Sequence, residues 1–222
     1  MKRKVPLVTG EIYHVVSKSI ANFVIFNNDS EFLRMRALFK YYQIKDPPYK
    51  FNYFMKIKIK EEDFDEYSSV YLSNKEKLVQ IIAYCIMSTH FHLILKQLKE
   101  GGISIFIGNV LNSYSRYFNT KHKRRGPLWE GKFKNVLVET DEQLLHLTRY
   151  IHLNPTSAGL VNKPEKWPYS SYLEYLGKTK KMNRICSYED LIDISPLSYK
   201  SFVESRISYQ RELEKIKHLI LE

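Results

Sequence analysis

The chain has 222 residues, of which 44% are hydrophobic and 27% charged, and these proportions predict a folded soluble protein rather than a disordered one. Its 35 lysines and arginines exceed its 24 aspartates and glutamates, and the net charge of +11 predicts a polyanionic partner, either nucleic acid or an anionic membrane surface. Two cysteines exclude a disulfide framework, and no apolar run approaches the roughly 18 residues of a membrane span, so we expect a reduced, cytoplasmic protein.

The first third of the chain predicts a strand, a helix and an insertion. Residues 11–17 are β-branched and aromatic, which favours a strand, and Asn28 to Ser30 offer N-caps for a helix that continues to about Tyr42. Pro47 and Pro48 follow it. We interpret residues 45–78 as an insertion, in which the loose alternation of 51–59 favours an extra strand and the acidic run 61–66 a solvated loop.

The middle of the chain predicts a hairpin, two helices and a further strand. Residues 79–87 and 90–97 form the hairpin, a helix covers about 103–120, and a strand covers 135–139. Thr140 and Gln143 have the spacing of a capping box, and we expect the helix they begin to end at Asn154, before Pro155. Beyond Pro164, weak amphipathic patterns predict helical segments at 187–194 and 198–220.

This order of elements predicts an α+β fold. It is that of a ferredoxin-like split βαβ antiparallel sheet with helices on one face, to which one further helix, bearing candidate catalytic residues, and a C-terminal helical extension are added. We expect residues 1–165 to form the catalytic domain, including the insertion, and residues 166–222 to form the extension.

His90-Phe91-His92 is the most informative short motif. Residues two apart in a strand point to the same face, so both imidazoles can reach a single divalent cation while Phe91 packs on the other side. The alternative is that a half-exposed strand carries two histidines by chance.

Three polar residues share one face of the helix that follows Thr140, because His146, Tyr150 and Asn154 lie four residues apart. A tyrosine can act as a covalent nucleophile towards phosphorus, and the amide oxygen of Asn154 suits a hard cation. The Asn154 oxygen and the imidazoles of His90 and His92 would make a three-ligand site for Mg²⁺ or Mn²⁺, with open positions for phosphate oxygens. The alternative is that Tyr150 is one of 17 ordinary tyrosines.

Residues 121–134 are a candidate DNA-binding segment because they combine six basic residues with one acid, Glu130. Phosphate contacts would set affinity and aromatic stacking would hold unpaired bases. The alternative is a solvated loop with Trp129 anchored in the core. The candidate DNA-binding residues are Lys121, Lys123, Arg124, Arg125, Trp129, Lys132 and Lys134.

Four strings along residues 5–176 resemble, in order, the REP-associated tyrosine transposases of the single-tyrosine HUH superfamily. They are GEIYHV from Gly10, MSTHFHLIL from Met87, GPLWEGKFK from Gly126 and RYIHLNP from Arg149. The resemblance implies that His90 and His92 are metal ligands, that Tyr150 is the nucleophile and that Asn154 supplies the third polar ligand. It also implies single-stranded or hairpin DNA as substrate, cleaved and rejoined through a 5′-phosphotyrosine.

Two departures from that family are visible. Ser88-Thr89 stands where the family usually has Pro-Asn, and the chain is longer between residues 44 and 78, which could alter DNA fit or the contacts of a homodimer. Two other functions remain open: a domesticated regulator that binds hairpin DNA with little turnover, and a nickase of the relaxase or replication-initiator type.

Overall fold

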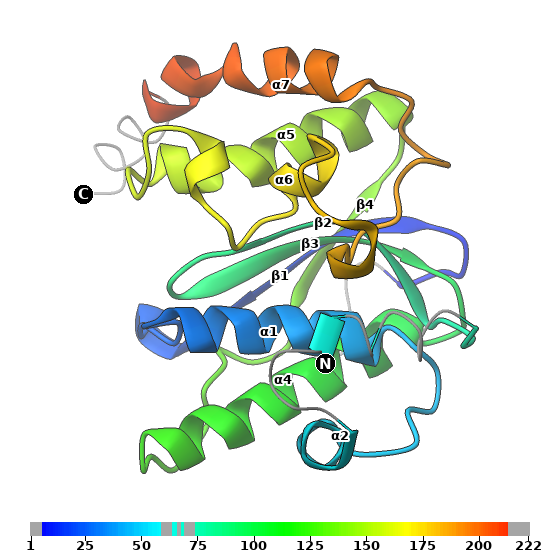
Figure 1. Ribbon diagram of the computed structural model, residues 1–222, viewed down its shortest axis with the longest axis vertical. Helices are drawn as coiled ribbons and strands as arrows, with labels where there is room; N and C mark the ends of the chain where they lie inside the picture. Colours follow the sequence, from blue (N-terminus) through cyan, green and yellow to red (C-terminus); the bar gives the residue numbers. More distant parts are fainter. Residues whose placement is uncertain (1–5, 59–63, 66–67, 69–73, 213–222) are drawn as a thin grey trace.

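A four-stranded antiparallel sheet lies at the centre of the protein (Figure 1). The computed structural model describes residues 6–58, 64–65, 68 and 74–212. The strands β1 (Ile12–Lys18), β2 (Val79–Ile86), β3 (His90–Gln97) and β4 (Lys134–Val138) are arranged in the order β2-β3-β1-β4. β3 therefore lies between β1 and β2, and β1 lies between β3 and β4, which is the split βαβ arrangement that the order of elements predicted.

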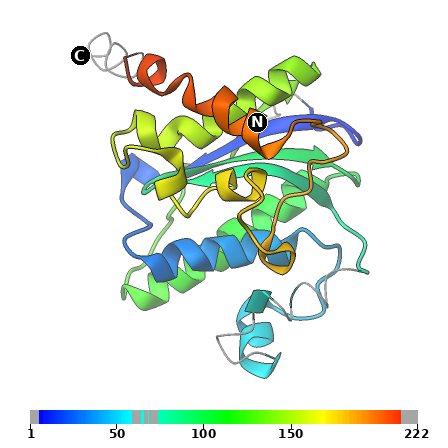
Figure 2. The same cartoon turned by 45° about the horizontal axis from the view of Figure 1, so that its top comes forward.

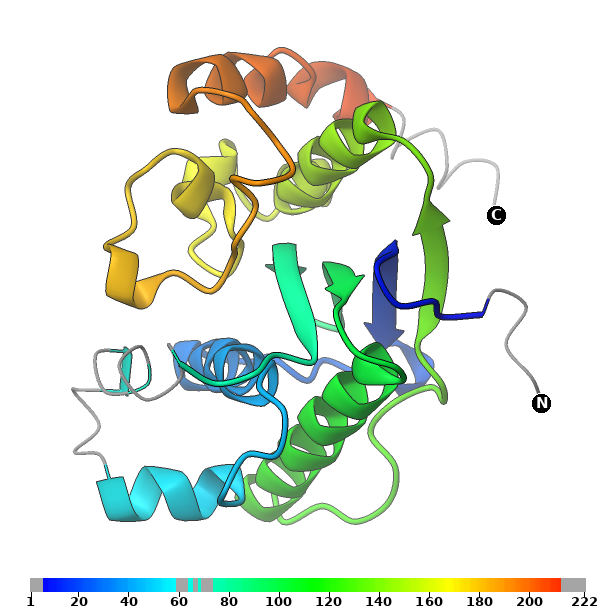
Figure 3. The same ribbon diagram turned by 90° about the vertical axis from the view of Figure 1, so that its right-hand side faces the viewer.

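Two long helices cover one face of the sheet, α1 (Asp29–Tyr42) and α4 (Gly102–Lys121) (Figure 3). Their contact with the sheet is aromatic: the ring centroid of Phe39 on α1 is 5.2 Å from that of Phe91 on β3 and 6.3 Å from that of Phe106 on α4. The four strands predicted for the sheet and these two helices are confirmed to within two residues.

The opposite face of the sheet is covered by α5 (Asp141–Ser157), with α6 (Tyr172–Tyr175) and α7 (Pro196–Glu204) packed around it (Figures 1 and 2). The N-terminus of α5 is capped as predicted, because the Thr140 hydroxyl accepts a hydrogen bond from the Gln143 backbone N–H. The predicted end of α5 at Asn154 was wrong. Proline lacks only its own N–H, and the Ala158 N–H donates to the Asn154 carbonyl at 2.9 Å, which completes a further turn.

The extra strand expected at 51–59 was also wrong, since this segment is the helix α2 (Phe51–Lys58). Phe51 and Phe54 are three residues apart, and a helix lets both rings contact Tyr41 on α1, with centroids 5.2 and 4.7 Å away. The alternation of polar and apolar residues was therefore coincidental. Of the acidic run 61–66 only Phe64 and Asp65 lie within the described residues, and Asp65 forms a 3.1 Å ion pair with Lys40.

The segment after Pro164 differs from the prediction in its helices. Residues 187–194 form turns and irregular backbone, because Tyr188 is held by stacking on Tyr175 (3.7 Å between centroids) rather than by a helix. α7 begins at Pro196 and ends at Glu204, the backbone is again helical at 207–212, and the predicted stretch from 213 to 220 lies outside the described residues. The short 3-10 helices of the described residues are Ile20–Asn22, Pro164–Lys166 and Lys181–Asn183.

In the part of the chain that the structure describes, no helix is both long enough and apolar enough to cross a membrane.

Candidate metal and nucleophile site

The alternation of β3 places His90 and His92 on the face of the sheet that α5 covers, and Phe91 on the face of α1 and α4. Phe91 is fully buried and its ring contacts Phe39 of α1, which fixes the orientation of the strand. Directly across the ladder, His90 pairs with Lys18 and His92 with Val16 of β1. The two imidazole ring centroids lie 5.1 Å apart.

Each histidine has its Nδ1 atom at hydrogen-bonding distance from a neighbour. His92 Nδ1 is 2.9 Å from Nε2 of His14, and His90 Nδ1 is 3.0 Å from the hydroxyl oxygen of Thr89. No hydrogen bond to either Nε2 atom is found within the described residues. The Nε2 atoms are therefore the nitrogens that remain to bind a cation.

His14 is a neighbour that the sequence analysis did not single out as a candidate. Its ring is stacked on His92, with 5.2 Å between centroids and 15° between planes. The sequence did contain a sign of this role, because His14 lies at an alternating position of β1 within the GEIYHV string. Only the pairing of β1 with β3 shows that His14 lies beside His92.

The three imidazoles are neutral at neutral pH. Burial lowers the pKa of His14 to about 4, and burial together with the charge of Lys18 lowers the pKa of His90 to about 4. Burial also holds the pKa of His92 well below its usual value, with His90, His14 and Lys18 adding to the effect. A histidine that binds a metal through a ring nitrogen must have no proton on that nitrogen. The lowered pKa values of His90 and His92 therefore favour the form that can bind a cation.

α5 brings Tyr150 to the histidine pair. The half-buried Tyr150 ring is perpendicular to the His92 ring, at 90° and with 6.2 Å between centroids. Residue 150 is thus next to the face of the sheet that carries His90 and His92, although 58 residues separate Tyr150 from His92 in the sequence.

Asn154 lies one helical turn beyond Tyr150 and is half-buried. Its Nδ2 atom is buried and has no hydrogen-bond partner, which is unusual for a buried amide. Because the oxygen and nitrogen of such an amide are interchangeable by rotation, a ligand for the oxygen would explain the unpaired group.

The donor set fits a hard cation that keeps open positions. The described residues contain no group of three or more histidine, cysteine or acidic side chains that could hold a metal ion. Two imidazole nitrogens and one amide oxygen are fewer ligands than Mg²⁺ or Mn²⁺ requires, so further positions would be filled by water or phosphate oxygens.

The other two histidines of α5 lie elsewhere. His146 is exposed and its ring contacts Phe202 of α7, with 5.6 Å between centroids. His152 is fully buried, with Nδ1 2.6 Å from the Tyr199 hydroxyl and Nε2 2.7 Å from the Ser171 hydroxyl. Both ring nitrogens of His152 are engaged, so this histidine has no lone pair for a metal.

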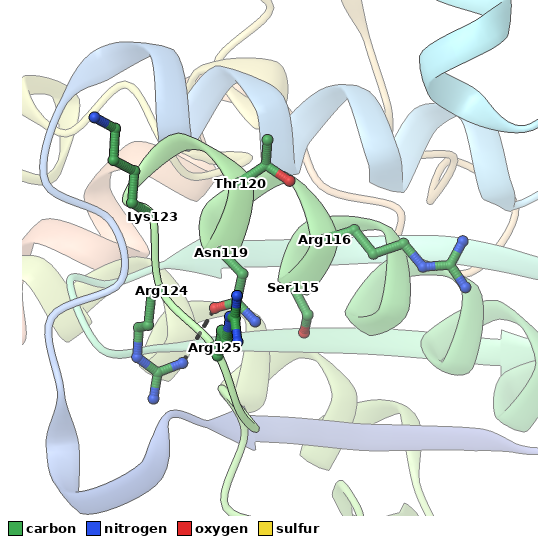
Figure 4. Close-up of a pocket in the computed structure, with 7 residues that line it drawn as sticks. All are labelled: Ser115, Arg116, Asn119, Thr120, Lys123, Arg124 and Arg125. Atoms are coloured by element: carbon green, nitrogen blue, oxygen red, sulfur yellow. Dashed lines mark hydrogen bonds between the residues drawn. The ribbon is translucent and has the colours of Figure 1, made fainter.

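The basic segment 121–134 connects the end of α4 to the start of β4 and forms part of two pockets. The first is a pocket of about 530 Å³ at the C-terminal end of α4 (Figure 4). Arg116, on the exposed side of α4, was not among the predicted residues. The pocket is lined by Ser115, Arg116, Asn119, Thr120, Lys123, Arg124 and Arg125.

The second pocket, of about 140 Å³, lies at the sheet and includes Lys132 and Lys134. Lys18 also lines it and was not predicted, yet Lys18 is the cross-strand neighbour of His90. We call the basic residues of these two pockets the basic surface, and Lys18 places one part of it next to His90. Its remaining lining residues are Val16, Ser17, Glu130 and Gly131.

Three of the predicted DNA-binding residues are engaged with the protein itself. Lys121 forms a 3.0 Å ion pair with the buried Glu31, and Arg124 donates to the Asn119 side chain and to the Pro127 carbonyl. Trp129 is only 9% exposed, packs against Phe91 and donates its indole N–H to Ser115. Its ring packs in the core, which is the alternative that the sequence left open for Trp129.

Comparison with known proteins agrees with this architecture. The model of a family described as IS200-like transposases matches residues 47–154. A Haemophilus influenzae protein assigned to the REP-associated tyrosine transposases is 28% identical over 120 residues, which are 49% of this chain and 68% of that protein.

A solved structure of a REP-associated tyrosine transposase bound to a REP hairpin has the same fold. It is 12% identical, with a TM-score of 0.51 over 88% of this chain and 96% of that one. The chain is therefore similar to the IS200-like transposase family over residues 47–154, and it is a distant homologue of the REP-associated tyrosine transposases.

Proposed function

We propose that this protein is a transposase, a metal-dependent endonuclease that cleaves and rejoins single-stranded or hairpin DNA through a 5′-phosphotyrosine on Tyr150. The observation that carries the proposal is the perpendicular contact between Tyr150 and His92, at 6.2 Å between ring centroids. A phenol beside two neutral imidazoles with available Nε2 atoms is the combination that phosphoryl transfer to tyrosine needs.

In this proposal His90 and His92 bind Mg²⁺ or Mn²⁺ through Nε2, and Asn154 binds it through its amide oxygen. When bound, the cation polarises the scissile phosphodiester and neutralises charge that develops on its oxygens. The sheet holds the two imidazoles and α5 holds the amide and the phenol, so ligands and nucleophile come from two rigid elements.

Tyr150 then acts as the nucleophile. Its hydroxyl oxygen forms a bond to phosphorus, and the bond from phosphorus to the 3′ oxygen breaks. The phenol loses one proton and the leaving 3′ oxygen gains one, so the released strand ends in a 3′-hydroxyl. Because the bond energy is retained in the phosphotyrosine, a 3′-hydroxyl can reverse the step and rejoin strands without nucleotide hydrolysis.

The DNA would lie along the basic surface described above. Arg116, Lys123 and Arg125 at the first pocket, and Lys18, Lys132 and Lys134 at the second, would contact phosphates and set the register of the strand. Hairpin DNA is the ligand of the solved relative, which supports the same class of substrate here.

We further propose that the catalytic domain ends near residue 165 and that residues 166–222 form an extension, whose described part includes residues that contact α5. The contacts of His152 with Ser171 and Tyr199 support this division, because they join the extension to the helix that carries Tyr150. We also propose that two copies of this chain form a homodimer.

The decisive experiment is a covalent-adduct assay. The protein is incubated with labelled hairpin DNA bearing single-stranded flanks and with Mg²⁺ or Mn²⁺, and denaturing gels are used to detect a protein–DNA adduct. Tyr150→Phe should abolish the adduct and leave DNA binding intact, whereas the control Tyr53→Phe, at an exposed position of α2, should change neither.

An adduct that survives Tyr150→Phe would reject the nucleophile, and cleavage that survives EDTA would reject the metal. Tight binding of hairpins without any cleavage by the wild-type protein would support a DNA-binding regulator instead.

A further inference from the structure

His14 is the strongest candidate for a role beyond the proposed site residues. It lies on β1, opposite Ile94 and diagonal to His92, and its ring is stacked on that of His92 at 5.2 Å. The two rings approach through nitrogens, His14 Nε2 and His92 Nδ1, which are 2.9 Å apart.

This contact restricts the protonation of both rings. A neutral imidazole has one N–H donor and one acceptor nitrogen. A hydrogen bond between them then has two possible directions. Only when His92 donates from Nδ1 does its Nε2 atom carry a lone pair for a cation.

His90 has an equivalent restraint on its own Nδ1 atom. The Thr89 hydroxyl oxygen is 3.0 Å from His90 Nδ1, and a hydroxyl can accept a hydrogen bond as readily as it donates one. The two restraints come from different elements: Thr89 lies in the turn between β2 and β3, and His14 lies on β1.

We propose that His14 is a positioning residue that accepts a hydrogen bond from Nδ1–H of His92 and so presents Nε2 of His92 to the metal, while Thr89 does the same for His90. The inference rests on the metal site of the proposed function. Groups that fix the tautomer and ring orientation of a metal-binding histidine change metal affinity by about 10–100-fold when they are removed.

The first test measures metal affinity rather than activity. Calorimetric titration of the full chain with Mn²⁺ should show that His14→Leu, which fills a similar volume without an acceptor, raises the Kd about 10-fold or more. His14→Gln, whose side-chain oxygen can accept from His92, should keep the Kd within about threefold of the wild-type value. Retention of the wild-type Kd by His14→Leu would overturn the proposal.

A matched pair tests Thr89 in the same way. Thr89→Val removes the hydroxyl at nearly constant shape and should weaken Mn²⁺ binding, whereas Thr89→Ser should preserve it. His146→Leu is the control, because this exposed histidine contacts Phe202 and lies outside the cluster. Thermal unfolding of each variant shows that the measured protein is folded.

The second test is spectroscopic and needs no metal. In long-range ¹H–¹⁵N spectra of histidine-labelled, metal-free protein near pH 7.5, His92 should be the Nδ1–H tautomer, and His14→Leu should shift it towards the Nε2–H tautomer. An Nε2–H tautomer in the wild-type protein would overturn the role of His14.

The two measurements separate the two hypotheses. If the wild-type protein binds no Mn²⁺, the metal site of the proposed function fails, and the tautomer of His92 alone still decides whether His14 orients it. If Mn²⁺ binds and His14→Leu leaves both the Kd and the tautomer unchanged, the metal site stands and the positioning role is rejected.

Discussion

Two buried histidines of this protein, His92 and His152, differ in how their ring nitrogens are used. His92 and His152 are both buried, and burial lowers the pKa of both. His152 has a partner on each ring nitrogen, the Tyr199 and Ser171 hydroxyls. His92 has a partner on Nδ1 only and has the Tyr150 ring beside it.

The difference separates a structural histidine from a candidate ligand. A lowered pKa shows only that the charged form is disfavoured, which burial achieves at either position. His90 and His92 differ from His152 in having an Nε2 lone pair that makes no hydrogen bond within the described residues. The Tyr150 ring also lies beside His92. His152, by contrast, joins α5 to the C-terminal extension.

The largest expected effect is on catalysis, when His90 is replaced. His90→Ala removes one proposed ligand and should slow adduct formation by roughly 10²–10³-fold or more, because charge on the transferring phosphate is no longer stabilised. Because His90 is only half-buried, its removal should lower the stability little. Time courses on hairpin DNA and thermal melts measure the two quantities. A variant that cleaves at the wild-type rate would contradict the ligand role.

The reciprocal experiment replaces His152. His152→Ala removes a buried hydrogen-bond partner from the Tyr199 hydroxyl and one of the partners of the Ser171 hydroxyl, and it opens a cavity, so the free energy of unfolding should fall by about 2–4 kcal/mol. Mn²⁺ affinity of the folded variant should stay close to that of the wild type. Urea unfolding and metal titration measure these. If His152→Ala lost metal binding but kept its stability, His152 would be a metal ligand rather than a structural histidine.

The buried neutral ring of His152 should make the free energy of unfolding depend on pH. Burial lowers the pKa of His152 to about 3 from 6.5, so between these values the unfolded chain binds a proton that the folded chain does not. Stability from this group is therefore lost as pH falls from about 6.5 towards 3, at about 1.4 kcal/mol per pH unit.

Urea unfolding of the wild type and of His152→Gln at several pH values between 4.5 and 6.5 isolates that contribution, because the other titrating groups are common to both proteins. The slope of stability against pH should be smaller in the variant by about 1.4 kcal/mol per unit. Equal slopes would show that His152 is not buried as a neutral ring.

The smallest effect extends the comparison from histidines to basic residues. Arg125 is exposed, whereas Lys121 is paired with the buried Glu31. Arg125→Ala should weaken hairpin binding roughly fivefold near physiological salt and reduce the salt slope of log K by about 1. Lys121→Ala should mainly lower stability, since Glu31 loses a partner. Fluorescence anisotropy at several salt concentrations measures the binding, and an unchanged slope for Arg125→Ala would remove Arg125 from the DNA surface.

The sequence determined the order of the elements and the short-range geometry. The alternation of strands put His90 and His92 on one face, and the capping pair Thr140 and Gln143 started α5 at the right residue. These features depend on neighbours within a few positions, so local periodicity was sufficient. The same reasoning failed at 51–59, where packing of Phe51 and Phe54 on Tyr41 favoured a helix.

Only the tertiary structure decided which side chains meet. The pairing of β1 with β3 brings His14 to His92, and the placement of α5 across the sheet brings Tyr150 to the same ring. It also turned Trp129 into the core and engaged both nitrogens of His152. Contacts between residues far apart in the chain depend on register and on how layers pack, and no local pattern in the sequence contains that information.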